Sequence, residues 1–191
     1  MKFCPMENQE GFIPKHGGYR NLLTYQKAEI IYDGTVYFCN RFFHKYDRTV
    51  GQMVQAARSG KQNIAEASMA SGTSKGTEIK LTNVARASLE ELLIDYEDFI
   101  RTRKLTKWDR SHRYSKRFDE LNRTPNANYN TFKKAIENSN PEICANIMRC
   151  LINVTTYLLR RQLYTLEREF LEEGGIRERM FKARVNRRNN K

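Results

Sequence analysis

Apolar residues recur every three to four positions in four long stretches of the chain, which is the spacing of one buried face of an α-helix. In the first stretch the repeat includes Leu22, Ile30 and Tyr37, and in the third it includes Leu92 and Phe99. No segment alternates apolar and polar residues in the manner of a β-strand. The pattern therefore predicts an all-α protein, folded as an up-and-down antiparallel four-helix bundle. The predicted helices span residues 19–44, 47–70, 77–99 and 140–173.

Capping residues indicate where these helices begin and end. Asp47 precedes the second helix, and Asn140 followed by Pro141 places a cap residue before a proline at the first helical position. The Gly174–Gly175 pair is expected to end the fourth helix, because glycine readily adopts the conformation that follows a helix C-terminus.

Three segments differ from these helices. Residues 1–18 are expected to form a flexible N-terminal arm, because prolines and a glycine pair interrupt them. Residues 107–140 are too long for a bundle loop, which usually has about 2–8 residues. They contain two short amphipathic patches and predict an inserted helical hairpin, or a partly mobile flap, within a bundle of residues 19–173. Residues 174–191 form a basic C-terminal suffix.

Several classes of protein are disfavoured by composition. No stretch is long and apolar enough to span a bilayer, and the N-terminal residues lack the apolar core of a signal peptide. The four cysteines show no CxxC spacing and are expected to be reduced thiols, and the three histidines have no metal-ligand spacing. We therefore expect a cytoplasmic protein with no metal, no cofactor and no membrane contact.

The net charge of +12 is concentrated in two segments. Residues 101–125 contain nine Lys/Arg against three Asp/Glu, and residues 176–191 contain seven Lys/Arg against Glu178, so each segment has a net charge of +6. The remaining 18 basic and 18 acidic residues cancel. Concentrated positive charge is typical of surfaces that bind nucleic acid. The candidate nucleic-acid-binding residues are Arg101, Arg103, Lys104, Lys107, Arg110, Arg113, Lys116, Arg117, Arg177, Arg179, Lys182, Arg184, Arg187 and Arg188.

Aromatic residues accompany the cations of the first basic segment. Trp108, Tyr114 and Phe118 predict either rings that stack on bases or the apolar side of a helix docked on the bundle. The second basic segment predicts an RNA- or DNA-binding arm, a solubilising terminus, or a helix that packs on a neighbouring subunit.

The second and third predicted helices contain polar residues on faces that otherwise have small side chains. An amide, carboxylates and hydroxyls brought together between two helices can satisfy each other's hydrogen bonds and fix the register of the helices. The sequence therefore predicts a structural polar network, with direct contact to a partner as the alternative. Catalysis would need a second carboxylate or a neighbouring histidine at suitable spacing, so we expect no catalytic residue and no enzyme activity. The network residues are Ser59, Asn63, Glu66, Ser88 and Glu91.

These polar positions belong to a pattern that resembles the signature of the 23S rRNA intervening-sequence protein family of bacterial four-helix bundles. The resemblance covers residues 20–105, and more loosely 141–172, and the ending FLEEGGIRERM resembles a C-terminal suffix found on a subset of the family. The matching positions are Gln52, Ala56, Ser59, Asn63, Ile64, Ala65, Glu66, Ala85, Ser88, Leu89, Glu91 and Leu92.

The resemblance implies a basic bundle that assembles into a ring-shaped homopentamer. One relative, the accessory variability determinant of diversity-generating retroelements, has the same bundle and binds nucleic acid and a reverse transcriptase. This chain departs from the pattern at Val54 and Gln55, where the family usually has arginine, and at Ala67, where it usually has glycine. No nucleic-acid-binding residue is therefore transferred from relatives.

Two functions follow as expectations. The first is a non-enzymatic, oligomeric accessory protein that binds RNA or DNA and assists a reverse transcriptase or another RNA-processing partner. The alternative is a protein-interaction scaffold that binds an acidic protein through the same basic segments.

Overall fold

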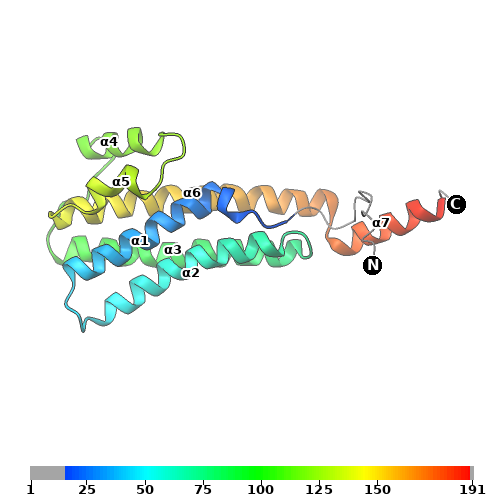
Figure 1. Ribbon diagram of the computed structural model, residues 1–191, viewed down its shortest axis with the longest axis horizontal. Helices are drawn as coiled ribbons and strands as arrows, with labels where there is room; N and C mark the ends of the chain where they lie inside the picture. Colours follow the sequence, from blue (N-terminus) through cyan, green and yellow to red (C-terminus); the bar gives the residue numbers. More distant parts are fainter. Residues whose placement is uncertain (1–15, 190–191) are drawn as a thin grey trace, which may run out of the picture.

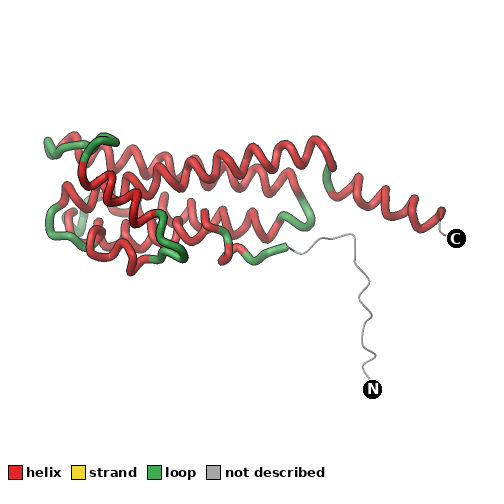
Figure 2. Tube along the Cα trace, turned by 90° about the horizontal axis from the view of Figure 1, so that it is seen from above, coloured by secondary structure: helices red, strands yellow, loops and turns green. Residues whose placement is uncertain are grey.

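The computed structural model describes residues 16–189, and this part of the chain is all-α, as the sequence predicts. Helices are joined only by loops and turns, and no strand occurs between residues 16 and 189 (Figure 2). A short 3-10 helix, Tyr19–Asn21, precedes the first α-helix. The α-helices are α1 (Leu23–Phe42), α2 (Arg48–Ala70), α3 (Lys75–Thr102), α4 (Arg113–Asn122), α5 (Tyr129–Ile136), α6 (Pro141–Glu173) and α7 (Ile176–Asn189).

The four long helices α1, α2, α3 and α6 lie side by side, and successive ones run in opposite directions (Figure 1). Helix α2 packs on α1 and α3, and α6 packs on α3 and α1, so the four helices enclose a common apolar core. Phe38 lies at its aromatic centre, with its ring 4.8 Å from Tyr96 and 4.7 Å from Phe99, measured between ring centroids. Burial of these large side chains is the main stabilising contribution to such a core.

The predicted capping residues act as expected. The Asp47 carboxylate accepts a hydrogen bond from Thr49 N at 2.9 Å, and the Asn140 side chain accepts one from Glu142 N at 2.9 Å with Pro141 as the first helical residue. Gly174 follows α6 with φ 74°, in the left-handed region that favours glycine. Helix α3 begins two residues earlier than predicted, because Ser74 caps it by accepting a hydrogen bond from Thr77 N.

Small residues allow α2 and α3 to approach closely. A Cβ atom placed on Gly60 would lie 2.7 Å from Leu89 Cδ2, well inside van der Waals contact. Gly60 therefore gives Leu89 space to be completely buried between the two helices.

The segment between α3 and α6 contains two helices, which confirms the predicted helical patches. Helix α5 packs on α6 and α1, and α4 packs on α6, so the pair covers one end of the four-helix core (Figure 1). Phe118 of α4 and Phe132 of α5 are buried, with ring centroids 5.9 Å apart. The two helices of this segment are thus docked on the long helices α1 and α6.

The structure describes less of the N-terminal end of the chain than of the C-terminal end. Residues 1–15 of the predicted N-terminal arm, with Cys4, lie outside the described residues, as do residues 190–191. Gly17 is held against the end of α2, since its N–H donates to Ser68 O and its carbonyl accepts from Ser68 Oγ. At the other end, α7 extends beyond the four-helix core and has no buried residue (Figure 1). No helix in the described range is long and apolar enough to cross a membrane.

Candidate nucleic-acid interface

The linker of residues 103–112, in the middle of the first basic segment, lies along α6. Asn146 is completely buried and holds the linker on both sides, accepting from Trp108 N and donating to Thr106 O, both at 2.9 Å. Glu142, one turn earlier, accepts from Thr106 N at 3.0 Å and from Trp108 Nε1 at 3.4 Å. The hydrogen bond from Thr106 N lowers the pKa of Glu142.

Arg149 also contacts the linker, and we refer to Glu142, Asn146 and Arg149 together as the clamp. The Arg149 guanidinium donates to Trp108 O at 2.5 Å and lies 4.0 Å from the Glu97 carboxylate of α3. Its Nε is buried without a hydrogen-bond partner among the described residues. Glu142, Asn146 and Arg149 are spaced i, i+4 and i+7, so they share one face of α6. This polar stripe was not predicted from the sequence, although its helical spacing is present there.

The contacts around the clamp distinguish the two predictions for the aromatic residues, stacking on bases and docking on the bundle. Trp108 and Phe118 are each only 3% exposed, and the Trp108 ring stacks on His112 with centroids 4.8 Å apart. Tyr114 is half-buried against Trp108. All three rings pack against the rest of the protein. The buried rings of Trp108 and Phe118 have no exposed face on which a base could stack.

The cations of the first basic segment differ in availability. Arg103 is structural, because its guanidinium donates to Phe42 O at 2.9 Å and lies 4.0 Å from the centre of the Phe99 ring. Arg113 lies over the Tyr114 ring. Three others form exposed ion pairs: Arg101 with Asp98, Lys107 with Glu97, and Arg117 with Glu120.

Exposed ion pairs contribute little and are readily exchanged for another anion. The four remaining cations, Lys104, Arg110, Lys116 and Arg123, are exposed and form no ion pair within residues 16–189. The segment therefore presents a positive surface, although a weaker one than the sequence alone indicates.

The cations of helix α7 are more accessible than those of the first basic segment. The only carboxylate in the helix, Glu178, accepts a hydrogen bond from Gly175 N at 2.8 Å, and backbone N–H groups lower its pKa. Glu178 therefore acts at the start of the helix, where a negative charge is favourable. The six cations of α7 form no ion pair in the described part of the chain, and three of them, spaced i, i+7 and i+11, share one face. These three are Arg177, Arg184 and Arg188.

The polar network between α2 and α3 is smaller than predicted. Ser59 Oγ and Ser88 Oγ are 2.9 Å apart, and Asn63 Nδ2 donates to Ser59 O at 2.9 Å and to Ser59 Oγ at 3.2 Å. These three residues are half-buried. Glu66 and Glu91 are exposed, and no hydrogen bond joins either to the other three. The structure thus brings together the hydroxyls and the amide but not the two acids.

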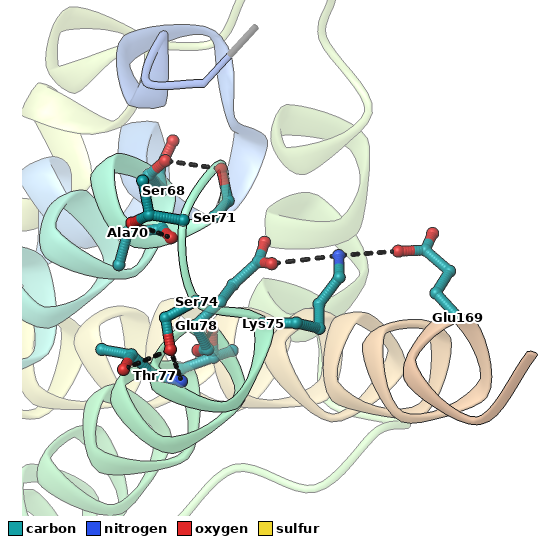
Figure 3. Close-up of polar contacts among 10 residues, drawn as sticks. Ser68, Ala70, Ser71, Ser74, Lys75, Thr77, Glu78 and Glu169 are labelled. Atoms are coloured by element: carbon teal, nitrogen blue, oxygen red, sulfur yellow. Dashed lines mark hydrogen bonds and ion pairs between the residues drawn. The ribbon is translucent and has the colours of Figure 1, made fainter. Parts of the chain in front are cut away.

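An ion-pair cluster with one buried member, Glu78, lies at the turn between α2 and α3, and it was not predicted from the sequence. Lys75 Nζ lies 3.0 Å from the carboxylates of both Glu78 and Glu169, so it links the start of α3 to the far part of α6 (Figure 3). Burial lowers the pKa of Lys75, but hydrogen bonds to Glu169 and Glu78 outweigh it and leave the pKa raised. The cluster fixes α6 beyond the centre of the core, on the path toward α7.

Two further observations concern metal binding and the reactivity of the cysteines. Within residues 16–189, no three His, Cys, Asp or Glu side chains are grouped in a way that could hold a metal ion. Cys39 and Cys144 are buried free thiols, and burial raises the pKa of each to about 12. Such thiols stay protonated near neutral pH and are poor nucleophiles.

Comparison with known proteins adds no assignment, since no family model, curated protein or solved structure matches the chain.

Proposed function

We propose that this protein is a non-enzymatic nucleic-acid-binding accessory protein, built as an up-and-down four-helix bundle with two cationic appendages. The observation that supports this most is α7, an exposed helix whose six cations have no ion-pair partner in the described part of the chain. Phosphate groups would supply the missing anions, and release of their counterions would drive the binding. The exposed cations of residues 101–117 are the second contact surface.

Assembly and partners follow from the resemblance to the intervening-sequence family. We propose a homopentamer, in which a ring would repeat both basic surfaces and strengthen binding through multivalency. A reverse transcriptase is the first protein partner to test.

The test is binding of labelled RNA and DNA at about 100 mM salt. A variant with Gln at all six α7 cations should bind at least about tenfold more weakly, because each lost phosphate contact reduces the electrostatic contribution. The matched control places Gln at exposed cations of the core, which should change binding little. The control positions are Arg41, Arg48, Arg58 and Lys80.

Two results would contradict the proposal. One is wild-type protein that binds neither RNA nor DNA, and the other is an α7 variant that binds as the wild type does. If no nucleic acid binds but an acidic protein co-purifies after nuclease treatment, the scaffold alternative replaces the proposal.

A further inference from the structure

The second half of α6 exposes tyrosine rings that are not among the residues predicted to bind nucleic acid. Tyr157 is 56% exposed and Tyr164 is 68% exposed. They are seven residues apart, so they lie on the same face of the helix, about 10.5 Å from each other along its axis. Trp108 and Phe118 are buried, so these tyrosines, together with Phe170 of α6 and Phe181 of α7, are the exposed aromatic rings near the cationic segments.

Arginines flank the two rings on the same face. Arg160, Arg161 and Arg168 lie within one turn of Tyr157 or Tyr164, at helical spacings of three or four residues. Arg161 is exposed, and the other two form only exposed ion pairs, Arg160 with Glu90 and Arg168 with Glu172. A phosphate group can displace such partners, because exposed ion pairs are weak.

The face also connects the two basic segments. At its N-terminal side, Tyr157 and Asn153 line a groove of about 810 Å³ together with Trp108 and Arg110 of the linker. At its C-terminal side, α6 leads directly to α7 (Figure 1). Aromatic rings interleaved with arginines thus run from the groove, along α6, toward the cationic helix.

We propose that this face of α6 is a track for single-stranded nucleic acid, with bases stacked on Tyr157 and Tyr164 and phosphates bound by the neighbouring arginines. Stacking on aromatic side chains requires unpaired bases, since a duplex keeps its base faces inside the stack. This inference rests on the proposed function and adds to it a substrate class, a strand without base pairs. Charge complementarity between the arginines and a phosphate backbone favours this occupant over a second protein surface.

The experiment compares binding of an oligo(dT) of about 16 nucleotides with binding of a duplex of the same length. In the full chain, the double substitution Tyr157→Ala and Tyr164→Ala should weaken oligo(dT) binding at least about tenfold, while duplex binding should change less than about twofold. The double substitution to Phe should retain most of the oligo(dT) affinity, because stacking needs the ring and not the hydroxyl. Tyr46→Ala is the matched control, since Tyr46 is 81% exposed in the loop between α1 and α2.

The possible failures are distinguishable. If the wild type binds neither probe, the proposed function is wrong. If the wild type binds both and the alanine variant keeps its oligo(dT) affinity, or loses both affinities equally, only the track is overturned. A change in molecular mass by light scattering, with unchanged oligo(dT) binding, would instead identify this face as an interface between copies of the chain and would also overturn the track.

Discussion

At the scale of single residues, polar groups inside the helical core are stabilised by specific partners. Tyr96 is the largest fully buried side chain, and its hydroxyl donates to Thr35 Oγ1 at 3.1 Å between α3 and α1. Lys27 is only 4% exposed, and its Nζ donates to Asn122 Oδ1 at 2.5 Å. The two cases differ, because a neutral hydroxyl pair loses little on burial whereas a charged amine without a carboxylate partner loses its hydration.

Replacing Thr35 tests the first case. Thr35→Val should lower the free energy of unfolding by about 1–3 kcal/mol, because it leaves the Tyr96 hydroxyl buried without an acceptor. Adding Tyr96→Phe should restore part of the loss, since both polar groups are then absent. Urea denaturation of the two variants gives both values. Equal stability of Thr35→Val and wild type would show that the hydrogen bond contributes nothing.

Replacing Lys27 tests the second case. Burial lowers the pKa of Lys27, so the unfolded chain binds more protons than the folded one at pH values between this lowered pKa and about 10.4. Stability from this group should therefore rise with pH across that window. Lys27→Met should remove the rise and increase the free energy of unfolding at pH 7. The gain should exceed the change of about 0.5 kcal/mol that is typical of substitutions at exposed positions.

The control for this measurement is Lys80→Met, because Lys80 is exposed. It should change stability by less than about 0.5 kcal/mol. A Lys27→Met variant that is less stable than wild type at pH 7 would mean that the contact with Asn122 outweighs the cost of burying the charge.

At the scale of helices, apolar spacing and capping residues were sufficient to predict most elements. Asn140, Pro141 and Gly174 set the ends of α6 through local hydrogen bonding and backbone geometry, which short sequence patterns specify directly. The course of residues 103–112 was not predictable, because it depends on Asn146 and Arg149 of α6, about 40 residues away in sequence. The helical spacing of these polar residues shows that they share a face of α6, but it does not show which distant segment they contact.

The clamp at Asn146 can be tested through Trp108, the single tryptophan of the chain. Asn146→Leu keeps the volume of the side chain but leaves Trp108 N and Thr106 O without their partner, each at a cost of about 1–3 kcal/mol. We expect the tryptophan emission to shift to longer wavelength and its quenching by acrylamide to increase, with little change in helix content. Asn40→Leu, at an exposed position of α1, should leave both unchanged. Unaltered quenching in Asn146→Leu would show that the linker is held by other contacts.

At the scale of the whole molecule, the structure separates a helical core from cationic surfaces at its two ends. The first basic segment, which includes α4, lies at one end of the core, α7 extends from the opposite end, and α6 spans the distance between them (Figure 1). The sequence predicted where the charge lies along the chain. It did not predict which cations are free, because pairing depends on carboxylates of α3 such as Glu97, nor did it predict that Trp108 is buried while Tyr157 and Tyr164 are exposed.

The most direct test of the account is the salt dependence of binding to duplex DNA, measured for the full chain and for a chain that ends at Gly175. Removal of α7 should leave the core intact, since α7 has no buried residue. Each lost phosphate contact reduces the slope of log Kobs against log salt concentration by about 0.9, so the slope should fall by about 3–5 if three to six cations bind phosphate. Identical slopes for the two chains would contradict the claim that α7 binds the phosphate backbone.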